Sequence, residues 1–137
     1  MGVHMVKILA ALLISVSISG CTVIAGLAAL MPSKWDPNEV ASVTDLRFHV
    51  RKVNCDTPEA ALPTLQTLVD KKDWTWMYSE SRKNKDVLEL IRPFNETLDD
   101  LYTRAKSGKM SKAFCNGKVV ILTTQADAIG RALQTRN

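Results

Sequence analysis

The chain has 137 residues, with 18 lysine and arginine residues against 14 aspartate and glutamate residues, which gives a formal net charge of +4. This weak excess is dispersed along the sequence. A phosphate-tracking groove needs a concentrated basic patch, so we expect no nucleic-acid partner. The part that follows Ser33 is about 100 residues long, which is enough for one small domain with a modest core.

The N-terminal segment carries the parts of a secretory signal peptide. Lys7 precedes a long uncharged apolar run that ends in Ile18-Ser19-Gly20-Cys21, and a basic lead, an apolar stretch and small residues at a cleavage point are typical of such signals. Because a cysteine follows the small pair, the pattern resembles a bacterial lipobox. The resemblance implies that Cys21 is acylated with diacylglycerol and becomes the first residue of the mature chain. We expect no other cofactor.

This interpretation divides the chain into a signal peptide (residues 1–20), a lipidated tether (21–34) and a folded domain (35–137), whether translation starts at Met1 or Met5. The alternative is one uncleaved transmembrane helix over residues 8–31, since about 20 apolar residues span a bilayer. Thr22 stands where lipoproteins kept in the inner membrane favour aspartate. The lipobox resemblance therefore implies that the sorting machinery places the protein on the periplasmic face of the outer membrane.

Two cysteines remain after Cys21, namely Cys55 and Cys115. In an oxidising compartment such a pair predicts a disulfide, whereas two thiols with only His49 nearby would make a poor metal site. Closing a loop of about 60 residues stabilises a fold by roughly 4 kcal/mol. Two buried free thiols are the alternative.

The first predicted helix begins after Asp36-Pro37-Asn38-Glu39. Asp36 is the expected N-cap, Pro37 takes the first helical position and Glu39 the third, an arrangement typical of a capping box. Apolar residues then follow helical spacing up to Asn54-Cys55: Val43, Leu46, Val50 and Val53. The alternation of Leu46, Phe48 and Val50 would fit a strand, but the cap favours a helix.

Asp56-Thr57-Pro58-Glu59 repeats the start signal for a second helix, in which Pro63 is expected to introduce a bend. Its predicted inward face consists of Leu62, Leu65, Leu68 and Val69. Trp74, Trp76 and Tyr78 follow at alternate positions, so they cannot all face one helical core. We therefore expect at least one of the three in a groove or surface patch, and if one tryptophan belongs to the core we expect it to be Trp74.

The third segment has the clearest helical periodicity, because six apolar residues recur at spacings of four and three: Val87, Ile91, Phe94, Leu98, Leu101 and Ala105. We expect a kink near residues 89–93 because Pro93 interrupts the hydrogen bonding. Gly108 in the Ser107-Gly108 pair is the residue that best tolerates a left-handed helix end.

The last segment is ambiguous from sequence. Residues 118–124 are rich in β-branched side chains, and Asn116-Gly117 would suit a hairpin turn. Helical spacing nevertheless continues to the end of the chain through Leu122, Ala126, Ile129 and Leu133. We therefore favour a helix from about Ser111 to Gln134 over a strand.

Four helices with short connections favour an all-α, up-and-down four-helix bundle. In that topology Cys55, at the far end of the first helix, and Cys115, near the start of the fourth, lie at the same end of the bundle. The expected topology and the expected disulfide are thus mutually consistent.

No catalytic arrangement is evident. His49 is the one histidine that follows Cys21, and no serine or free cysteine is placed to be its nucleophile. Glu96, Asp99 and Asp100 fit the solvated side of an amphipathic helix. We therefore expect neither catalytic residues nor a metal site, and we expect that the protein is not an enzyme.

Several features together resemble the small all-helical pilotins of type II secretion systems. These features are the lipobox, a helix ending in Asn54-Cys55-Asp56, a second helix closing with Lys72-Asp73-Trp74, a tyrosine-containing third segment, and Lys112-Ala113-Phe114-Cys115-Asn116 before a last helix. The resemblance covers Arg51 to the C-terminus, and the Trp74/Trp76 pair and the β-rich residues 119–124 depart from it. It implies a lipoprotein that binds the C-terminal segment of the secretin, the outer-membrane channel subunit, and directs its transport to the outer membrane.

A secretin tail of this kind would fold as an amphipathic helix in an apolar groove between bundle helices. We expect the core or that groove to contain Val50, Val53, Leu65, Val69, Trp74, Phe94, Leu98, Ile121 and Leu122. One alternative is an envelope lipoprotein that binds peptidoglycan through Trp76, Tyr78 and the basic run Arg82-Lys83-Asn84-Lys85. Another is a spanin, exclusion or conjugation-associated lipoprotein, which would bind an inner-membrane or foreign partner.

Overall fold

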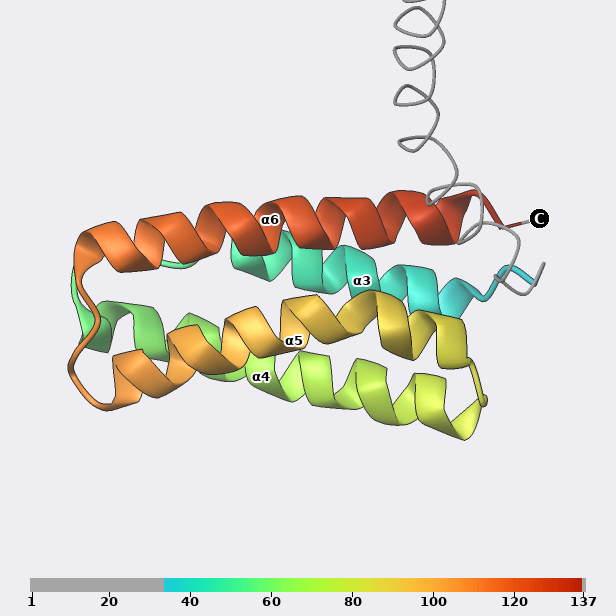
Figure 1. The fold of residues 1–137 in the computed structure, drawn as a ribbon, viewed down its shortest axis with the longest axis horizontal. Helices are drawn as coiled ribbons and strands as arrows, with labels where there is room; N and C mark the ends of the chain where they lie inside the picture. Colours follow the sequence, from blue (N-terminus) through green and yellow to red (C-terminus); the bar gives the residue numbers. More distant parts are fainter. Residues whose placement is uncertain (1–33, 137) are drawn as a thin grey trace, which may run out of the picture. The chain divides into compact units, whose positions relative to one another are not determined.

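The computed structural model describes residues 34–136, and all four predicted helices form there. They are α3 (Pro37–Val50), α4 (Pro58–Ser81), α5 (Lys85–Lys106) and α6 (Lys112–Gln134), coloured from cyan to red in Figure 1. The signal peptide, the acylation of Cys21 and the alternative transmembrane helix over residues 8–31 lie outside the described residues.

The helices form the expected up-and-down bundle. Successive helices run in opposite directions (Figure 1), and each packs against two others, so that α3 contacts α4 and α6 while α5 contacts the same two helices. The connections are short and span residues 51–57, 82–84 and 107–111. Over residues 34–136, no helix combines the length and apolar character needed to cross a membrane.

Side-chain caps fix where three of the helices begin. The Asp36 carboxylate accepts hydrogen bonds from the backbone amides of Asn38 and Glu39 at 2.9 and 3.4 Å. Thr57 caps α4 by accepting from the Ala60 amide at 3.1 Å, and Ser111 caps α6 by accepting from the Phe114 amide at 3.2 Å. These bonds satisfy amides that have no partner within the helix.

Both strand alternatives are wrong. The alternation Leu46-Phe48-Val50 lies inside α3, and the β-branched residues 118–124 lie inside α6 together with Asn116-Gly117. In each case one helical face is buried and the intervening residues point outward, so packing of a continuous apolar stripe outweighs the local preference for a strand.

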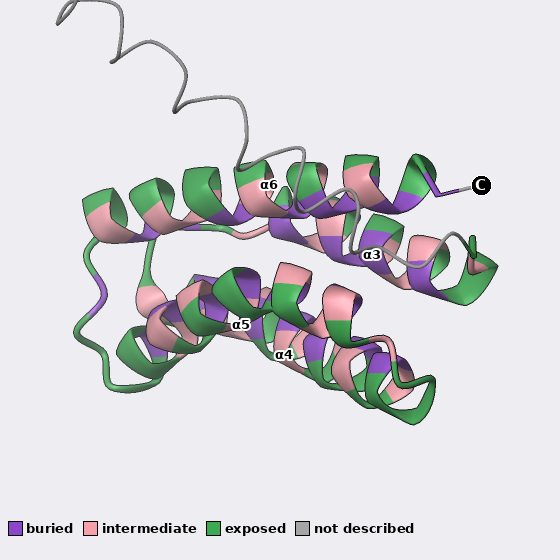
Figure 2. Cartoon of the chain, turned by 45° about the vertical axis from the view of Figure 1, so that its right-hand side comes forward, coloured by how far each residue is buried: buried purple, intermediate pink, exposed green. Residues whose placement is uncertain are grey.

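The core runs along the bundle between the four inward faces, which appear purple in Figure 2. The stripes predicted for the third and fourth segments are buried in full, as are Leu65 and Leu68 of α4. Leu62, Val69 and Val53 are partly buried and pack against this core. Burial of these side chains supplies most of the stabilisation of such a small domain.

The C-terminal half of α4 differs from expectation, because its buried face becomes polar. Lys72, Thr75 and Ser79 occupy the inward positions after Leu68. Trp76, eight residues after Leu68, packs against the core, whereas Trp74 is 48% exposed. The alternative that takes Trp74 as the core tryptophan is therefore wrong, since the helical repeat places Trp76 inward and turns Trp74 outward.

The predicted disulfide is confirmed. Cys55 and Cys115 are bonded, with their Cα atoms 5.6 Å apart and a sequence separation of 60. The bond joins the α3–α4 connection to the first turn of α6 at one end of the bundle. Here we call this the disulfide end.

The opposite end contains a buried polar cluster that corrects our interpretation of Glu39. The Glu39 side chain is 1% exposed and does not complete a capping box. It accepts hydrogen bonds from Ser79 Oγ at 3.1 Å, Asn84 Nδ2 at 2.6 Å and Arg136 Nη1 at 3.3 Å. Arg136 also pairs with Asp86, so the Glu39 cluster connects α3, α4 and α5 to Arg136, the second residue after α6.

Two helices are followed by a residue in the left-handed backbone region. Gly108 has a φ of 68° after α5, as its sequence position predicts, and Lys83 has a φ of 57° after α4. The amides of Lys83 and Asn84 donate to the carbonyls of Glu80 and Ser79 at 2.9 and 3.0 Å, which is the Schellman pattern. Lysine therefore adopts a conformation that glycine takes with less strain.

Candidate functional site

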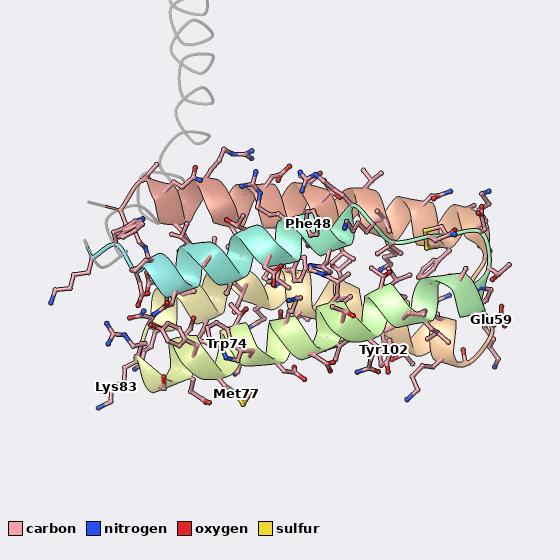
Figure 3. The ribbon with its side chains drawn as sticks, turned by 180° about the vertical axis from the view of Figure 1, so that it is seen from behind. Phe48, Glu59, Trp74, Met77, Lys83 and Tyr102 are labelled. Atoms are coloured by element: carbon pink, nitrogen blue, oxygen red, sulfur yellow. A yellow bond between two sulfur atoms is a disulfide. The ribbon has the colours of Figure 1, made fainter. Side chains whose placement is uncertain are left out.

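A groove of about 760 Å³ lies between α3 and α4 (Figure 3). Apart from the buried Thr75, its lining comes from the flanks of the two helices: Asn38, Ala41, Ser42, Thr44, Asp45 and Phe48 on α3, and Lys71, Trp74 and Thr75 on α4. Small side chains line much of it and two large aromatic side chains stand among them. The volume is typical of sites that accept ligands or peptide side chains.

Short polar side chains cross from one helix to the other within this groove. Ser42 Oγ and Thr75 Oγ1 are 2.8 Å apart, and Thr75 Oγ1 donates to the Lys71 carbonyl at 2.8 Å. Because the Thr75 proton is used in that bond, Ser42 is the donor to Thr75. The two hydroxyls are thus satisfied internally and do not require a ligand.

An ion pair spans the groove beside these hydroxyls. Lys71 Nζ on α4 contacts the Asp45 carboxylate on α3. The ring of His49 lies next to the pair, with its Nδ1 2.9 Å from the Asp45 carbonyl and 3.3 Å from Asp45 Oδ1. His49 is therefore bound to its own helix, and no nucleophile is aligned with it among these contacts.

Trp74 forms one wall of the groove and is held in place from one side. Its ring stacks on Tyr78, with ring centroids 5.1 Å apart and an interplanar angle of 10°. The Tyr78 hydroxyl donates to the Asp36 carboxylate at 3.1 Å and accepts from Asn38 Nδ2 at 3.0 Å. These bonds fix Tyr78 against α3, so Trp74 presents a large apolar surface with restricted motion.

Phe48 is the second exposed aromatic residue, at 53% exposure. Lys52 lies 3.8 Å from its ring centroid, and the His49 ring meets it edge-on at 5.2 Å. In Figure 3 both Phe48 on α3 and Trp74 on α4 lie on the face that the two helices share, and Met77 projects from α4 away from α3. Together Phe48 and Trp74 supply separated apolar contacts along one groove.

Most of the residues expected to form the core or the groove belong to the core. Five are fully buried and cannot contact a partner without unfolding: Val50, Leu65, Phe94, Leu98 and Leu122. Val53 and Val69 are partly buried against that core. Ile121 is 46% exposed on the outer side of α6 and belongs to neither region, so of the predicted set only Trp74 lines the groove.

Ionic contacts around α3 also connect it to α6. The Arg51 and Arg47 side chains both donate to the Asp127 carboxylate at 2.8 Å, and they hold the pKa of that carboxyl below its usual range. On the α4–α5 side, burial opposes the charge of Lys72, but hydrogen bonds to Asp99 and Asp73 outweigh it and raise the pKa of the ammonium group. These pairs hold the groove-forming helices in register.

The residues of the alternative peptidoglycan patch come together only in part. Trp76 packs against the core, whereas Tyr78 and Arg82 both contact the Asp36 carboxylate. Across residues 34–136, no group of three histidine, cysteine, aspartate or glutamate side chains is arranged to hold a metal ion. Comparison with known proteins gives no match to a family model, a curated protein or a solved structure.

Proposed function

We propose that this protein is a pilotin: a lipoprotein that binds the C-terminal segment of a type II secretion secretin and directs its transport to and assembly in the outer membrane. The observation that carries the proposal is the α3/α4 groove, in which Trp74 and Phe48 remain exposed beside short polar side chains. The lipobox-like segment that ends at Cys21 and the two bonded cysteines support it.

The groove suits an amphipathic helix. Trp74 and Phe48 stand on different helices, so a helical peptide lying between them can contact both with apolar residues on one face. Small residues such as Ala41 let the peptide backbone approach closely. Asp45 and Lys71 neutralise one another across the groove, so binding should rely on apolar burial and depend weakly on salt.

A preformed groove reduces the cost of binding. The secretin tail must lose conformational entropy when it becomes helical, and that cost is smaller overall when the receptor does not also need ordering. The Trp74–Tyr78 stack and the Tyr78 bonds to Asp36 and Asn38 already fix one wall. Affinity should therefore concentrate in the contacts made to Trp74, as is common for buried aromatic anchors.

Calorimetry with a synthetic peptide from the C-terminus of the cognate secretin tests the proposal. We expect a negative heat-capacity change from apolar burial and a loss of roughly tenfold or more in affinity for Trp74→Ala. Ile121→Ala is the matched control, because Ile121 is similarly exposed on α6 but lies outside the groove. Equal losses in the two variants, or no peptide binding at all, would contradict the proposal.

A cellular experiment separates recognition from targeting. The Cys21→Ser variant should retain peptide binding in vitro, because the groove lies in α3 and α4, but it should leave the secretin mislocalised. The Trp74→Ala variant should reach the outer membrane and still fail to deliver the secretin. Normal secretin assembly in cells that lack this protein would rule out the pilotin function.

A further inference from the structure

The end of the bundle at which α3 begins carries an exposed tryptophan among lysines. Trp35 is 53% exposed just before α3, and Lys34 beside it is also exposed. Lys83 and Lys85 are exposed around the α4–α5 turn, and Figure 3 shows Lys83 at the end of the bundle where the chain enters α3. Here we call Lys34, Trp35, Lys83 and Lys85 the basic end.

Contacts between the first turn of α3 and the α4–α5 turn bring these residues together. Arg82 Nε lies 3.5 Å from the Asp36 carboxylate, and Asn84 Nδ2 donates to Glu39 at 2.6 Å. Lys83, which stands between Arg82 and Asn84, is held in the left-handed conformation by the bonds that end α4. The basic end is therefore a fixed feature of the fold.

The positive charge at this end is not neutralised by its own acids. Asp36 is engaged with Arg82, and Glu39 and Asp86 are engaged with Arg136. Among the described residues Lys34, Lys83 and Lys85 form no ion pair. Glu80 is the exposed acid closest to Lys83 in sequence, and the exposed Glu89, four residues after Lys85, pairs with Arg92. The surface thus combines excess positive charge with an exposed indole ring.

We propose that the basic end docks on the surface of an anionic phospholipid bilayer. Tryptophan favours the headgroup region because its ring is apolar and its N–H is polar. Lysines near anionic lipids gain electrostatic attraction. The inference rests on the proposed function in one respect, the acylation of Cys21. The chain from Cys21 to Lys34 extends at most about 45 Å, so that anchor keeps this end near the bilayer.

This orientation has a consequence for the groove. The groove runs along the side of the bundle between α3 and α4, with lining residues from Asn38 to Phe48, and is not part of the basic end. Docking through the basic end therefore leaves the groove open to a partner while it limits rotation of the domain about its tether.

Fluorescence of the acylated mature protein in vesicles tests the inference. Trp74→Phe and Trp76→Phe leave Trp35 as the one tryptophan of the chain, which has three. In vesicles of phosphatidylglycerol and phosphatidylcholine we expect a blue shift of Trp35 emission and quenching by lipids brominated in their acyl chains. In phosphatidylcholine alone both effects should be much weaker, and added salt should reduce them.

Charge reversal supplies the matched comparison. Lys34→Glu, Lys83→Glu and Lys85→Glu together should lower the ratio of docked to undocked protein by about a hundredfold or more. Lys106→Glu and Lys109→Glu change exposed lysines near the disulfide end and should leave Trp35 quenching unchanged. An unquenched Trp35 in both vesicle types, or equal losses in the two sets of variants, would overturn the inference.

Three further measurements on the acylated protein that keeps Trp74 and Trp76 separate this inference from the proposed function. Retained secretin-peptide binding without Trp35 quenching would refute docking and leave the pilotin function standing. Absence of the acyl group from Cys21 by mass spectrometry would remove the premise that both share. Binding to isolated peptidoglycan sacculi through the three lysines, without quenching in vesicles, would replace the bilayer with peptidoglycan as the partner and so refute docking.

Discussion

The two ends of the bundle hold their helices together by different chemistry. At the disulfide end, one covalent bond between Cys55 and Cys115 joins the α3–α4 connection to α6. At the opposite end, a network of hydrogen bonds and ion pairs joins α3, α4 and α5 to Arg136, which follows α6; its members are Glu39, Ser79, Asn84, Asp86 and Arg136. The bundle is thus cross-linked at both ends, by the disulfide at one and by the Glu39 cluster at the other.

The two ends therefore respond to different changes. The disulfide stabilises the fold mainly by restricting the unfolded chain, and this contribution is lost when the bond is reduced. The Glu39 cluster stabilises the folded state only while every buried group keeps its partner, because an unpaired buried charge is costly. Within residues 34–136 the Arg136 guanidinium has two acidic partners, Glu39 and Asp86.

Removal of the disulfide should have the largest effect on stability. The double replacement Cys55→Ala and Cys115→Ala should lower the free energy of unfolding by about 4 kcal/mol, because the 60-residue loop is no longer closed in the unfolded chain. Urea unfolding of both proteins measures the difference, and reduction of the wild type should reproduce it. An unchanged unfolding midpoint, or two freely alkylated thiols in the folded protein, would contradict the account of this end.

Glu39→Gln should have the next largest effect. It removes the negative charge that faces Arg136 and leaves a buried guanidinium with Asp86 as its remaining acid, at an expected cost of about 2 kcal/mol. Glu89→Gln is the control, because Glu89 is exposed and should change stability by less than about 0.5 kcal/mol. Similar unfolding midpoints for the two variants would show that the Glu39 cluster does not stabilise the fold.

Asp127→Asn should weaken the α3–α6 contact by about 1 kcal/mol near neutral pH, since the carboxylate is partly exposed. The folded pKa of Asp127 is lowered, first by the hydrogen bond from Arg51 and then by that from Arg47. Its stabilisation is therefore present above the unfolded value of about 3.9 and is lost as the pH falls through the folded value. Urea unfolding at several pH values should show that the difference in free energy of unfolding between wild type and variant shrinks in acid. A difference that stays constant with pH would exclude this mechanism.

Lys83→Gly should have the smallest effect and the opposite sign. Glycine adopts the left-handed conformation without the steric cost that lysine bears, so stability should rise by about 0.5 kcal/mol. Gly108→Ala is the mirror experiment and should destabilise the protein, because alanine would have to adopt the φ of 68°. Thermal unfolding measures both changes, and a fall in the melting temperature of Lys83→Gly would refute the interpretation.

The fold was predictable because helix caps and apolar spacing are local features of the sequence, and because the disulfide depends on one pair of cysteines. Asp36 caps α3 as its position predicts, α6 begins one residue after the expected Ser111, and the stripe from Val87 to Ala105 is buried as its spacing predicts. Only two cysteines follow Cys21, which left one possible intramolecular bond between them. Topology and cysteine position then supported each other.

The groove was less predictable because it depends on which flanks of two helices face each other. Apolar periodicity identifies buried residues, so it selected Leu65, Phe94 and Leu98, all of which are core. The groove instead uses small residues such as Ser42 and the outward-facing Phe48. Glu39 was misassigned for a similar reason, because its long-range partners Asn84 and Arg136 leave no pattern near it in sequence.

The central claim is that the α3/α4 groove is the preformed site for a secretin tail, and an NMR titration tests it most directly. The compact unit of residues 32–137, labelled with nitrogen-15, is titrated with the secretin peptide. We expect the largest shifts at the Trp74 indole and at the amides of Ala41, Ser42 and Phe48, with the amides of Val120 and Ile121 unchanged. Shifts concentrated on α6, or no shifts at saturating peptide, would contradict the claim.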